Sequence, residues 1–271
     1  MINWILQKNL TKPEILERIK SILNQVDEIW EEVEVIPFST QIPKIQNNET
    51  FKIIYGSTTF MLNAYENEDL KEGIFFEPLK FKMTNYVDKW KDNVLNSDGQ
   101  LIRFEEIGSL ISEQNKKWFI RPNNDGKEFS GKVEQFNELV TWSEKVCQLE
   151  IPELNRNTEV WISEPKKIIK EWRLFIVDDQ IVSTSRYMYN GQLDESESDI
   201  PKEMIEFAQK RIEEYRLHDI YVMDIAEIAS EFKLIECNCF NGTGFYNHNI
   251  EAIVQSINKF VKQKIKKGTI G

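Results

Sequence analysis

The chain has 271 residues, enough for one large domain or two modest ones around a sizeable core. It carries 34 Lys and Arg against 45 Asp and Glu, a net charge of −11, which argues against broad binding of nucleic acid or anionic membranes but leaves a local basic pocket open. No segment approaches the roughly 20 apolar residues of a membrane span, and residues 1–10 lack the basic leader of a signal peptide.

The N-terminal region predicts a helix followed by strands. Thr11 begins a capping-box spacing, and apolar residues then recur with a helical period over residues 15–30. Residues 32–37 change to strand alternation, and residues 51–57 have the pattern of a strand that ends in a turn. We therefore expect a small α/β domain over residues 1–98.

The rest of the chain, residues 99–271, shows a more regular mixture of strands and helices. Strands are predicted at 118–122 and 159–163, a long hairpin over 171–187 with its turn at Asp178 and Asp179, and helices over 133–146, 204–215 and 250–261, the last capped by Asn249. Hairpins in place of a repeated βαβ alternation favour an α+β layered domain over a doubly wound sheet.

The cysteines indicate a reducing compartment. Cys147, Cys237 and Cys239 are odd in number and lack the spacing of a zinc site, so we interpret them as buried thiols. We expect a cytoplasmic protein, because free thiols persist in that compartment. The sequence carries no signal for an oligomeric state.

The most informative pattern lies in two apolar strands near the end of the chain. If residues 221–228 and 232–239 pair as a hairpin, residues whose numbers sum to about 460 face each other. Asp224 then lies opposite Glu236, and Asn238 shares their face because successive side chains of a strand alternate sides. The pattern therefore predicts three oxygen ligands at one place.

The same register puts Phe232 and Leu234 on this face, which is then mostly apolar. Ionised carboxylates in such a setting are costly unless something compensates them, and a bound divalent cation is the usual compensation. Two carboxylates and an amide suit Mg²⁺, which keeps positions for water and phosphate oxygens and so favours a nucleoside triphosphate as partner. The alternative is an ordinary amphipathic hairpin with polar residues near its open end.

Two groups of cations could hold phosphate. Arg121 and Lys127 flank a loop of small residues that lacks the P-loop spacing, and a simple polar turn is the alternative. In the long hairpin, pairing of numbers that sum to about 357 puts Arg173 and Arg186 on one face, where they could hold a phosphate or a substrate carboxylate. The alternative there is a cross-strand pair of Glu171 with Arg186.

Two remaining features carry weaker signals. Residues 159–167 leave a strand edge for a charged turn, and such an edge could bind adenine through backbone groups, as any connecting strand could. His218 and His248 are expected to be non-catalytic, because no serine or cysteine nucleophile appears in a recognisable partner motif.

Taken in order, these motifs resemble the ATP-grasp superfamily, and most closely a branch of small bacterial and phage-type ATP-grasp proteins. The resemblance covers roughly residues 51–255 and is carried by residues 54–60, 119–131, 163–173, 185–187, 224 and 236–240. It implies an ATP-grasp fold in which two α+β subdomains, about residues 99–162 and 163–271, grip ATP behind the N-terminal α/β domain of residues 1–98.

The resemblance also implies ATP and Mg²⁺ as cofactors, together with a set of site residues. The implied magnesium ligands are Asp224, Glu236 and Asn238, the implied phosphate-binding cations are Arg121, Lys127 and Arg173, and the implied adenine strand contains Glu159, Trp161, Ser163 and Glu164.

The implied activity is ATP-dependent carboxylate–amine ligation through an acylphosphate, with small-molecule or peptide carboxylates and amines as substrates. Arg173 and Arg186 are the expected catalytic cations, and Arg186 would orient the acceptor carboxylate or the acylphosphate. Two alternatives stay open: a phosphotransferase that stops after phosphorylating its substrate, and a nucleotide-binding protein without turnover.

Overall fold

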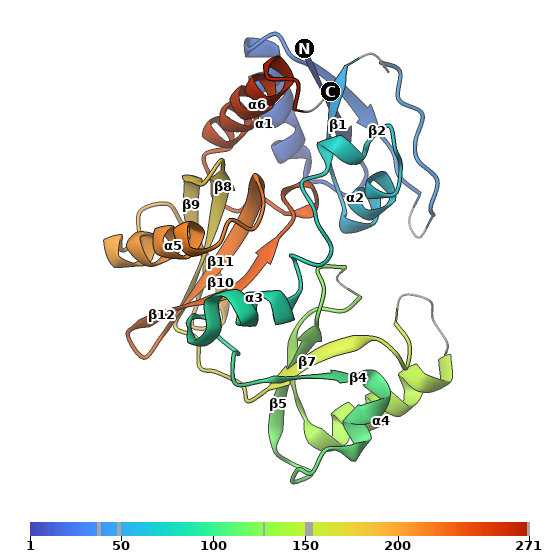
Figure 1. Cartoon of the computed structure of the whole chain (residues 1–271), viewed down its shortest axis with the longest axis vertical. Coiled ribbons are helices and arrows are strands. Elements are labelled where there is room, and N and C mark those ends of the chain that lie inside the picture. The colour runs from blue at the N-terminus through green and yellow to red at the C-terminus, as the bar shows by residue number, and fades with distance from the viewer. Residues whose placement is uncertain (37–38, 48–49, 127, 150–153, 270–271) are drawn as a thin grey trace.

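The computed structural model describes residues 1–36, 39–47, 50–126, 128–149 and 154–269. These residues form three sheets (Figure 1). The N-terminal sheet is parallel, in the order β2-β1-β3, with β1 (Ile2–Gln7), β2 (Ile29–Val33) and β3 (Phe51–Tyr55). The small sheet is antiparallel, in the order β4-β7-β5-β6, with β4 (Gln100–Arg103), β5 (Lys117–Pro122), β6 (Lys132–Gln135) and β7 (Glu159–Ser163).

The large sheet is antiparallel and contains the two hairpins that the sequence predicts. Its order is β10-β9-β8-β11-β12, with β8 (Lys170–Val177), β9 (Gln180–Tyr189), β10 (Gln192–Ser196), β11 (Ile220–Ile228) and β12 (Glu231–Asn238). The helices are α1 (Pro13–Gln25), α2 (Thr58–Tyr65), α3 (Met83–Trp90), α4 (Phe136–Leu149), α5 (Lys202–Glu214) and α6 (Ile250–Lys266). This mixture of layered sheets and helices confirms the α+β expectation.

Three local predictions are wrong. The side chain of Thr11 does not cap α1, because the N-cap residue is Lys12, which makes no side-chain cap bond. The helix ends at Gln25, so Trp30 belongs to β2. Val133 belongs to β6 and not to the following helix. By contrast, the Asn249 side chain accepts a hydrogen bond from the Ala252 amide, as expected of a cap.

The N-terminal strand β1, which the sequence pattern did not reveal, is the centre of its sheet. Its six residues are all buried, so it has no alternation of polar and apolar positions. A strand buried on both faces reads as a short apolar run, which periodicity cannot assign.

Two layers of helices enclose the large sheet. Helices α3 and α5 pack on the face of Trp172, Leu174 and Met223, whereas α6 packs on the opposite face with Phe175 and Val222. Both cores also include residues of the N-terminal sheet, so packing crosses the boundary proposed at residue 98. The small sheet and α4 have a separate core. The domain limits therefore stay a prediction.

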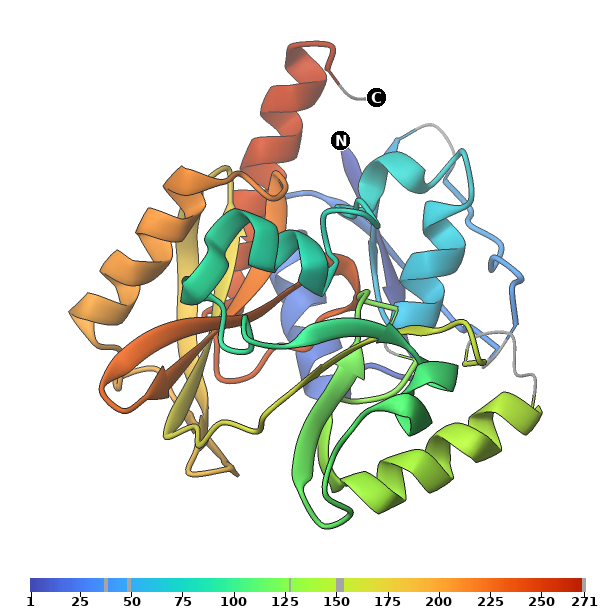
Figure 2. The ribbon, with the colours of Figure 1, turned by 60° about the horizontal axis from the view of Figure 1, so that its bottom comes forward.

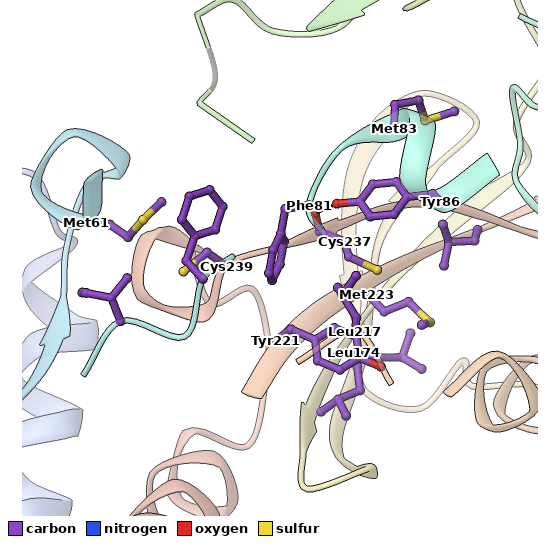
Figure 3. Close-up of a cluster of buried hydrophobic side chains, with 14 of the residues drawn as sticks. Met61, Phe81, Met83, Tyr86, Leu174, Leu217, Tyr221, Met223, Cys237 and Cys239 are labelled. Atoms are coloured by element: carbon purple, nitrogen blue, oxygen red, sulfur yellow. Dashed lines mark hydrogen bonds between the residues drawn. The ribbon is translucent and has the colours of Figure 1, made fainter. Parts of the chain in front are cut away.

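Strand β12 is fixed from its core side by α3 (Figure 3). The Tyr86 hydroxyl donates to the Cys237 carbonyl at 2.9 Å. Cys237 and Cys239 are buried, as expected, but Cys147 is only half-buried. Burial raises the pKa of the Cys237 thiol, which keeps it protonated and inert.

The small sheet and α4 lie at the opposite end of the molecule from α1 and α6 (Figure 1). After β7 the chain crosses from the small sheet to the large sheet, where β8 begins (Figure 2). Among the residues that the structure describes, no helix is both long and apolar enough to cross a lipid bilayer.

Candidate active site

The three predicted metal ligands lie together where β11 and β12 pair. Asp224 is directly opposite Glu236, and Asn238 is opposite Val222, as the sequence register requires. The Asn238 amide donates to Glu236 Oε1 at 3.2 Å and to Asp224 Oδ2 at 3.4 Å. Asp224 and Asn238 are each only 1% exposed, so these polar groups are held at one point inside the protein.

A β-bulge limits how far the predicted register holds. The pairing shifts between Asp224 and Ile225, so Ile225 faces Leu234 and Glu227 faces Phe232. An extra residue in one strand moves every later side chain to the other face. The expectation that Phe232 and Leu234 share the face of Asp224 is therefore wrong: both pack in the core beside α5.

Two arginines compensate the carboxylates. Arg173, paired with Asp224 in the β8–β11 register, donates to both Asp224 oxygens at 2.9 and 2.6 Å. Arg121, from the small sheet, has Nη1 at 2.8 Å from Glu236 Oε2. Burial opposes the charge of Arg173, but the adjacent Asp224 carboxylate outweighs it, so the pKa of the guanidinium is raised.

This charge pattern fits a site for Mg²⁺ and phosphate. Two carboxylates and an amide oxygen form the kind of donor set that Mg²⁺ accepts, and the arginines are the kind of cation that binds phosphate. No cluster of three or more His, Cys, Asp and Glu side chains suited to a metal occurs among the described residues, so the amide of Asn238 is needed to complete the set.

Arg186 does not join this group. A bulge between Phe175 and Ile176 shifts the β8–β9 pairing, so Arg186 lies opposite Trp172 and Arg173 lies opposite Ser185. The guanidinium of Arg186 instead forms ion pairs with Asp194 (3.0 Å) and Asp199. The expectation that Arg173 and Arg186 share a face is thus wrong, because one extra residue reverses the direction of a strand side chain.

Tyr187 occupies the place that the sequence register gave to Arg186. Its ring stacks on Tyr246 with centroids 4.7 Å apart, and the guanidinium of Arg173 lies 4.9 Å from the Tyr246 centroid. The Tyr187 hydroxyl donates to Glu171 Oε2 at 2.6 Å. Burial raises the pKa of Glu171 more than this hydrogen bond lowers it. Sequence reasoning assigned neither tyrosine to the site, although Tyr187 belongs to a motif that carries the family resemblance.

A cavity of about 430 Å³ lies between the small and large sheets; we call it the interlobe cavity. It is lined by both a cation and a predicted metal ligand, Arg121 and Glu236, and also by Glu171 and Tyr187. Its other walls come from Leu95, Asn96, Phe119, Pro122, Asn124, Asp125, Phe129, Ser130, Gly131, Val133, Lys166, Ile168 and Ile235. Apolar side chains and a few convergent polar groups are typical of a small-molecule site.

The loop after β5 joins the two sides of this cavity. Asp125 Oδ2 accepts a hydrogen bond from the Cys239 amide at 2.9 Å, which ties the loop to the end of β12. Gly131 packs against Phe119 and Arg121, where an added Cβ would lie 3.1 Å from the Phe119 ring. Lys127, a predicted phosphate ligand in this loop, lies outside the described residues.

The predicted adenine strand does not itself line the cavity. Glu159 accepts hydrogen bonds from Asn123 and Lys82, which lower its pKa, and Glu164 is exposed in an ion pair with Lys116. Trp161 is buried, with its indole bound to a backbone carbonyl at 2.8 Å.

Ser163 and the residues after it lie closer to the interlobe cavity. The Ser163 hydroxyl is buried and has no partner among the described residues. Ser163 pairs with Phe119, a wall residue, and Lys166 and Ile168 line the cavity directly. The segment that meets the cavity is therefore shifted toward β8 relative to the expectation.

Comparison with known proteins agrees with this geometry. A family model of the ATP-grasp domain, clade family 3, matches residues 55–257. A search of curated protein sequences gave no match. Among solved structures, the D-cycloserine synthetase DcsG has a TM-score of 0.64 at 9% identity, with 96% of this chain and 99% of that chain covered.

Two further solved structures contain nucleotides. The D-alanine–D-alanine ligase of Bacillus anthracis complexed with ATP has a TM-score of 0.60 at 13% identity, covering 98% of this chain and 99% of that one. The ATP-grasp ligase PsnB, complexed with a minimal precursor, Mg and ADP, has a TM-score of 0.54 at 9% identity, covering 96% and 98%. The TM-scores show a common fold. Because the family model matches most of its length, the chain belongs to the ATP-grasp domain proteins of clade family 3.

Proposed function

We propose that the protein is an ATP- and Mg²⁺-dependent carboxylate–amine ligase that acts through an acylphosphate. The observation that carries this proposal is the convergence of Asp224, Glu236 and Asn238 with Arg121 and Arg173 beside the interlobe cavity. Proteins of the same fold whose names describe them as ligases or synthetases support the type of reaction.

Different residues of the site bind different parts of ATP in this proposal. Arg121 and Arg173 bind phosphate oxygens, and the Glu171 carboxylate, exposed to the cavity, can accept hydrogen bonds from ribose hydroxyls. Asp224, Glu236 and Asn238 would hold Mg²⁺, which when bound neutralises phosphate charge. Lys127 and the hydroxyl of Ser163 are further proposed contacts, with phosphate and adenine respectively.

The reaction needs positioning and charge neutralisation more than a protein nucleophile. A substrate carboxylate oxygen attacks the γ-phosphorus, and ADP leaves with the electrons of the broken bond. The amine then attacks the acylphosphate carbon, phosphate leaves, and the amine loses a proton to give the amide. Arg173 stabilises the charge of both steps if it moves from Asp224 to the reacting phosphoryl group.

The first test is the thermal unfolding midpoint with ATP, with and without Mg²⁺, for the wild type and Glu236→Gln. A ligand at about 100 times its Kd stabilises a protein by roughly 2.7 kcal/mol, so a rise should be readily measured. We expect a Mg²⁺-dependent rise that the variant lacks. If no nucleotide raises the midpoint, the nucleotide site is refuted.

The second test separates ligation from phosphotransfer. Candidate carboxylates are incubated with ATP, with and without amines, and both free phosphate and phosphorylated product are measured. Amine-dependent release of phosphate with formation of an amide supports the ligase. A stable phosphorylated product that does not react with any amine would instead identify a phosphotransferase.

A further inference from the structure

The last helix concentrates positive charge in an acidic protein. Five lysines and no Asp or Glu occur in residues 252–271, a local charge of +5 in a chain of −11. Helix α6 carries four of these lysines and lies beside α1, at the end of the molecule away from the small sheet (Figure 1). Helix α6 therefore presents a row of lysines remote from the interlobe cavity.

A groove of about 400 Å³ runs along this surface; we call it the α6 groove. Lys259, Lys262 and Lys266 form one wall, since residues spaced by three and four share a helix face. The other lining residues are Val26, Gln255, Asn258 and Gln263. It shares no lining residue with the interlobe cavity.

The lysines of the groove are not equally neutralised. Lys262 forms an ion pair with the buried Glu28, which lies between α1 and β2 in the chain. No carboxylate of the described residues lies within ion-pair distance of Lys259 or Lys266, and both side chains are exposed. Two positive charges are thus available to a ligand.

Asn258 supplies an independent indication of a ligand. The Trp4 indole donates to Asn258 Oδ1 at 2.9 Å, and because an indole can only donate, the orientation of the amide is fixed. Its Nδ2 donor is then left without an acceptor among the described residues, although Asn258 is only 5% exposed. Buried donors are nearly always paired, so an acceptor is missing from this wall of the groove.

We propose that the α6 groove docks an acidic peptide segment of a partner protein. Carboxylates of the segment pair with Lys259 and Lys266, next to Asn258 in the groove. A polyanion long enough to extend past the groove would be repelled by the acidic remainder of the protein. A short segment avoids this repulsion, because charges more than about 8 Å away are largely screened at physiological ionic strength. A short acidic segment therefore fits this surface better than a nucleic acid.

Fluorescence anisotropy with a labelled peptide of alternating glutamate and alanine tests the proposal. The variant Lys259→Glu/Lys266→Glu should weaken binding at least about tenfold, which corresponds to about 1.4 kcal/mol. The control Lys145→Glu/Lys210→Glu makes the same charge change at exposed sites on α4 and α5 and should leave the affinity nearly unchanged. Far-ultraviolet circular dichroism and thermal unfolding verify that all variants fold.

Three results would overturn the proposal. Equal weakening in both double variants would mean that the peptide senses only overall charge. Absence of binding by the wild type at low salt would remove the docking site. Tighter, groove-dependent binding of a single-stranded oligonucleotide than of the peptide would assign the surface to nucleic acid. None of these results bears on ATP binding, which depends on a separate cavity.

Discussion

The two hairpins of the large sheet look alike in sequence but differ in what their registers place at the site. Both turn through two residues with positive φ, Asp178-Asp179 and Ala229-Ser230, as type I′ turns require. In β11–β12 the register is regular from Asp224 to the open end of the hairpin, so the predicted ligands meet. A bulge lies between the turn and the site residues in both hairpins. In β8–β9, however, the predicted register is that of the pairs beside the turn and not that of the pairs beyond the bulge, so the arginines are misplaced.

The difference shows that a site can be inferred from strand alternation only where the assumed register is the one that applies beyond any bulge. Arg173 keeps its place because it pairs directly with Asp224 on the neighbouring strand. Arg186 lies on the other face because its place was predicted from the register beside the turn, and an extra residue of β9 shifts the pairing before Arg186 is reached.

The largest expected effect is at the end of β12. Glu236→Gln should lower ATP-dependent turnover by about 100-fold, the usual size for loss of one electrostatic group. The fold should persist because the substitution is isosteric and Glu236 is partly exposed. Phosphate release and circular dichroism measure the two effects. Glu231→Gln, at the exposed turn end of the same strand, serves as control, and an equal loss there would contradict the site.

Substitutions of Arg173 and Arg186 should differ sharply in their effect on turnover. Arg173→Gln is expected to reduce turnover by about 100-fold, because it removes a charge from the site and leaves Asp224 uncompensated. Arg186→Gln should change turnover and KM little and lower the unfolding free energy by about 1 kcal/mol, because its acidic partners lie at the surface. Steady-state kinetics and urea denaturation test both. Similar kinetic losses would restore the catalytic role first expected of Arg186.

A pH experiment tests the contact between β9 and the chain after β12. His248 packs on Phe175 and pairs with the Ser183 hydroxyl at 2.9 Å, and burial lowers its pKa from 6.5 to about 3. The unfolded chain therefore binds a proton below about pH 6.5 that the native protein does not, so stability falls as the pH falls toward 3. At pH 5 the loss should be about 2 kcal/mol.

Denaturant unfolding of the wild type and His248→Asn at about pH 7.5 and about pH 5 isolates this term. The stability advantage of the wild type over the variant should shrink by about 2 kcal/mol at the lower pH, because the variant cannot titrate there. A pH-independent difference would mean that His248 is accessible to water in the native protein.

The smallest effect concerns the turns. Ser230 has φ of 69°, a conformation that glycine adopts more readily, so Ser230→Gly should raise the unfolding free energy by up to about 1 kcal/mol. Asp179 has φ of 62° but forms an ion pair with Arg216, so Asp179→Gly should bring no gain. Thermal unfolding of both variants measures the contrast. An equal gain in stability in the two variants would show that the ion pair with Arg216 does not stabilise the turn at Asp179.

Much of the site could be predicted because its residues are close in one register or carry distinctive chemistry. Asp224, Glu236 and Asn238 lie within one hairpin, so alternation alone indicated that they meet. Arg121 was identified only as a loop cation, and its approach to Glu236 joins two sheets far apart in sequence. Tyr246 gave no signal, and Asp125 was noted only as part of the cation loop, because their roles arise from contacts across the chain.

The sequence by itself determined the antiparallel hairpins, the meeting of Asp224, Glu236 and Asn238, and the mixed α+β class, because these depend on local period and on turns of a few residues. Only the tertiary structure decided which side of a bulged strand faces the cavity, where the wall contributed by the β7–β8 segment lies, and that β1 is a central strand. These features depend on one-residue shifts and on burial by distant elements, to which a periodic pattern is insensitive.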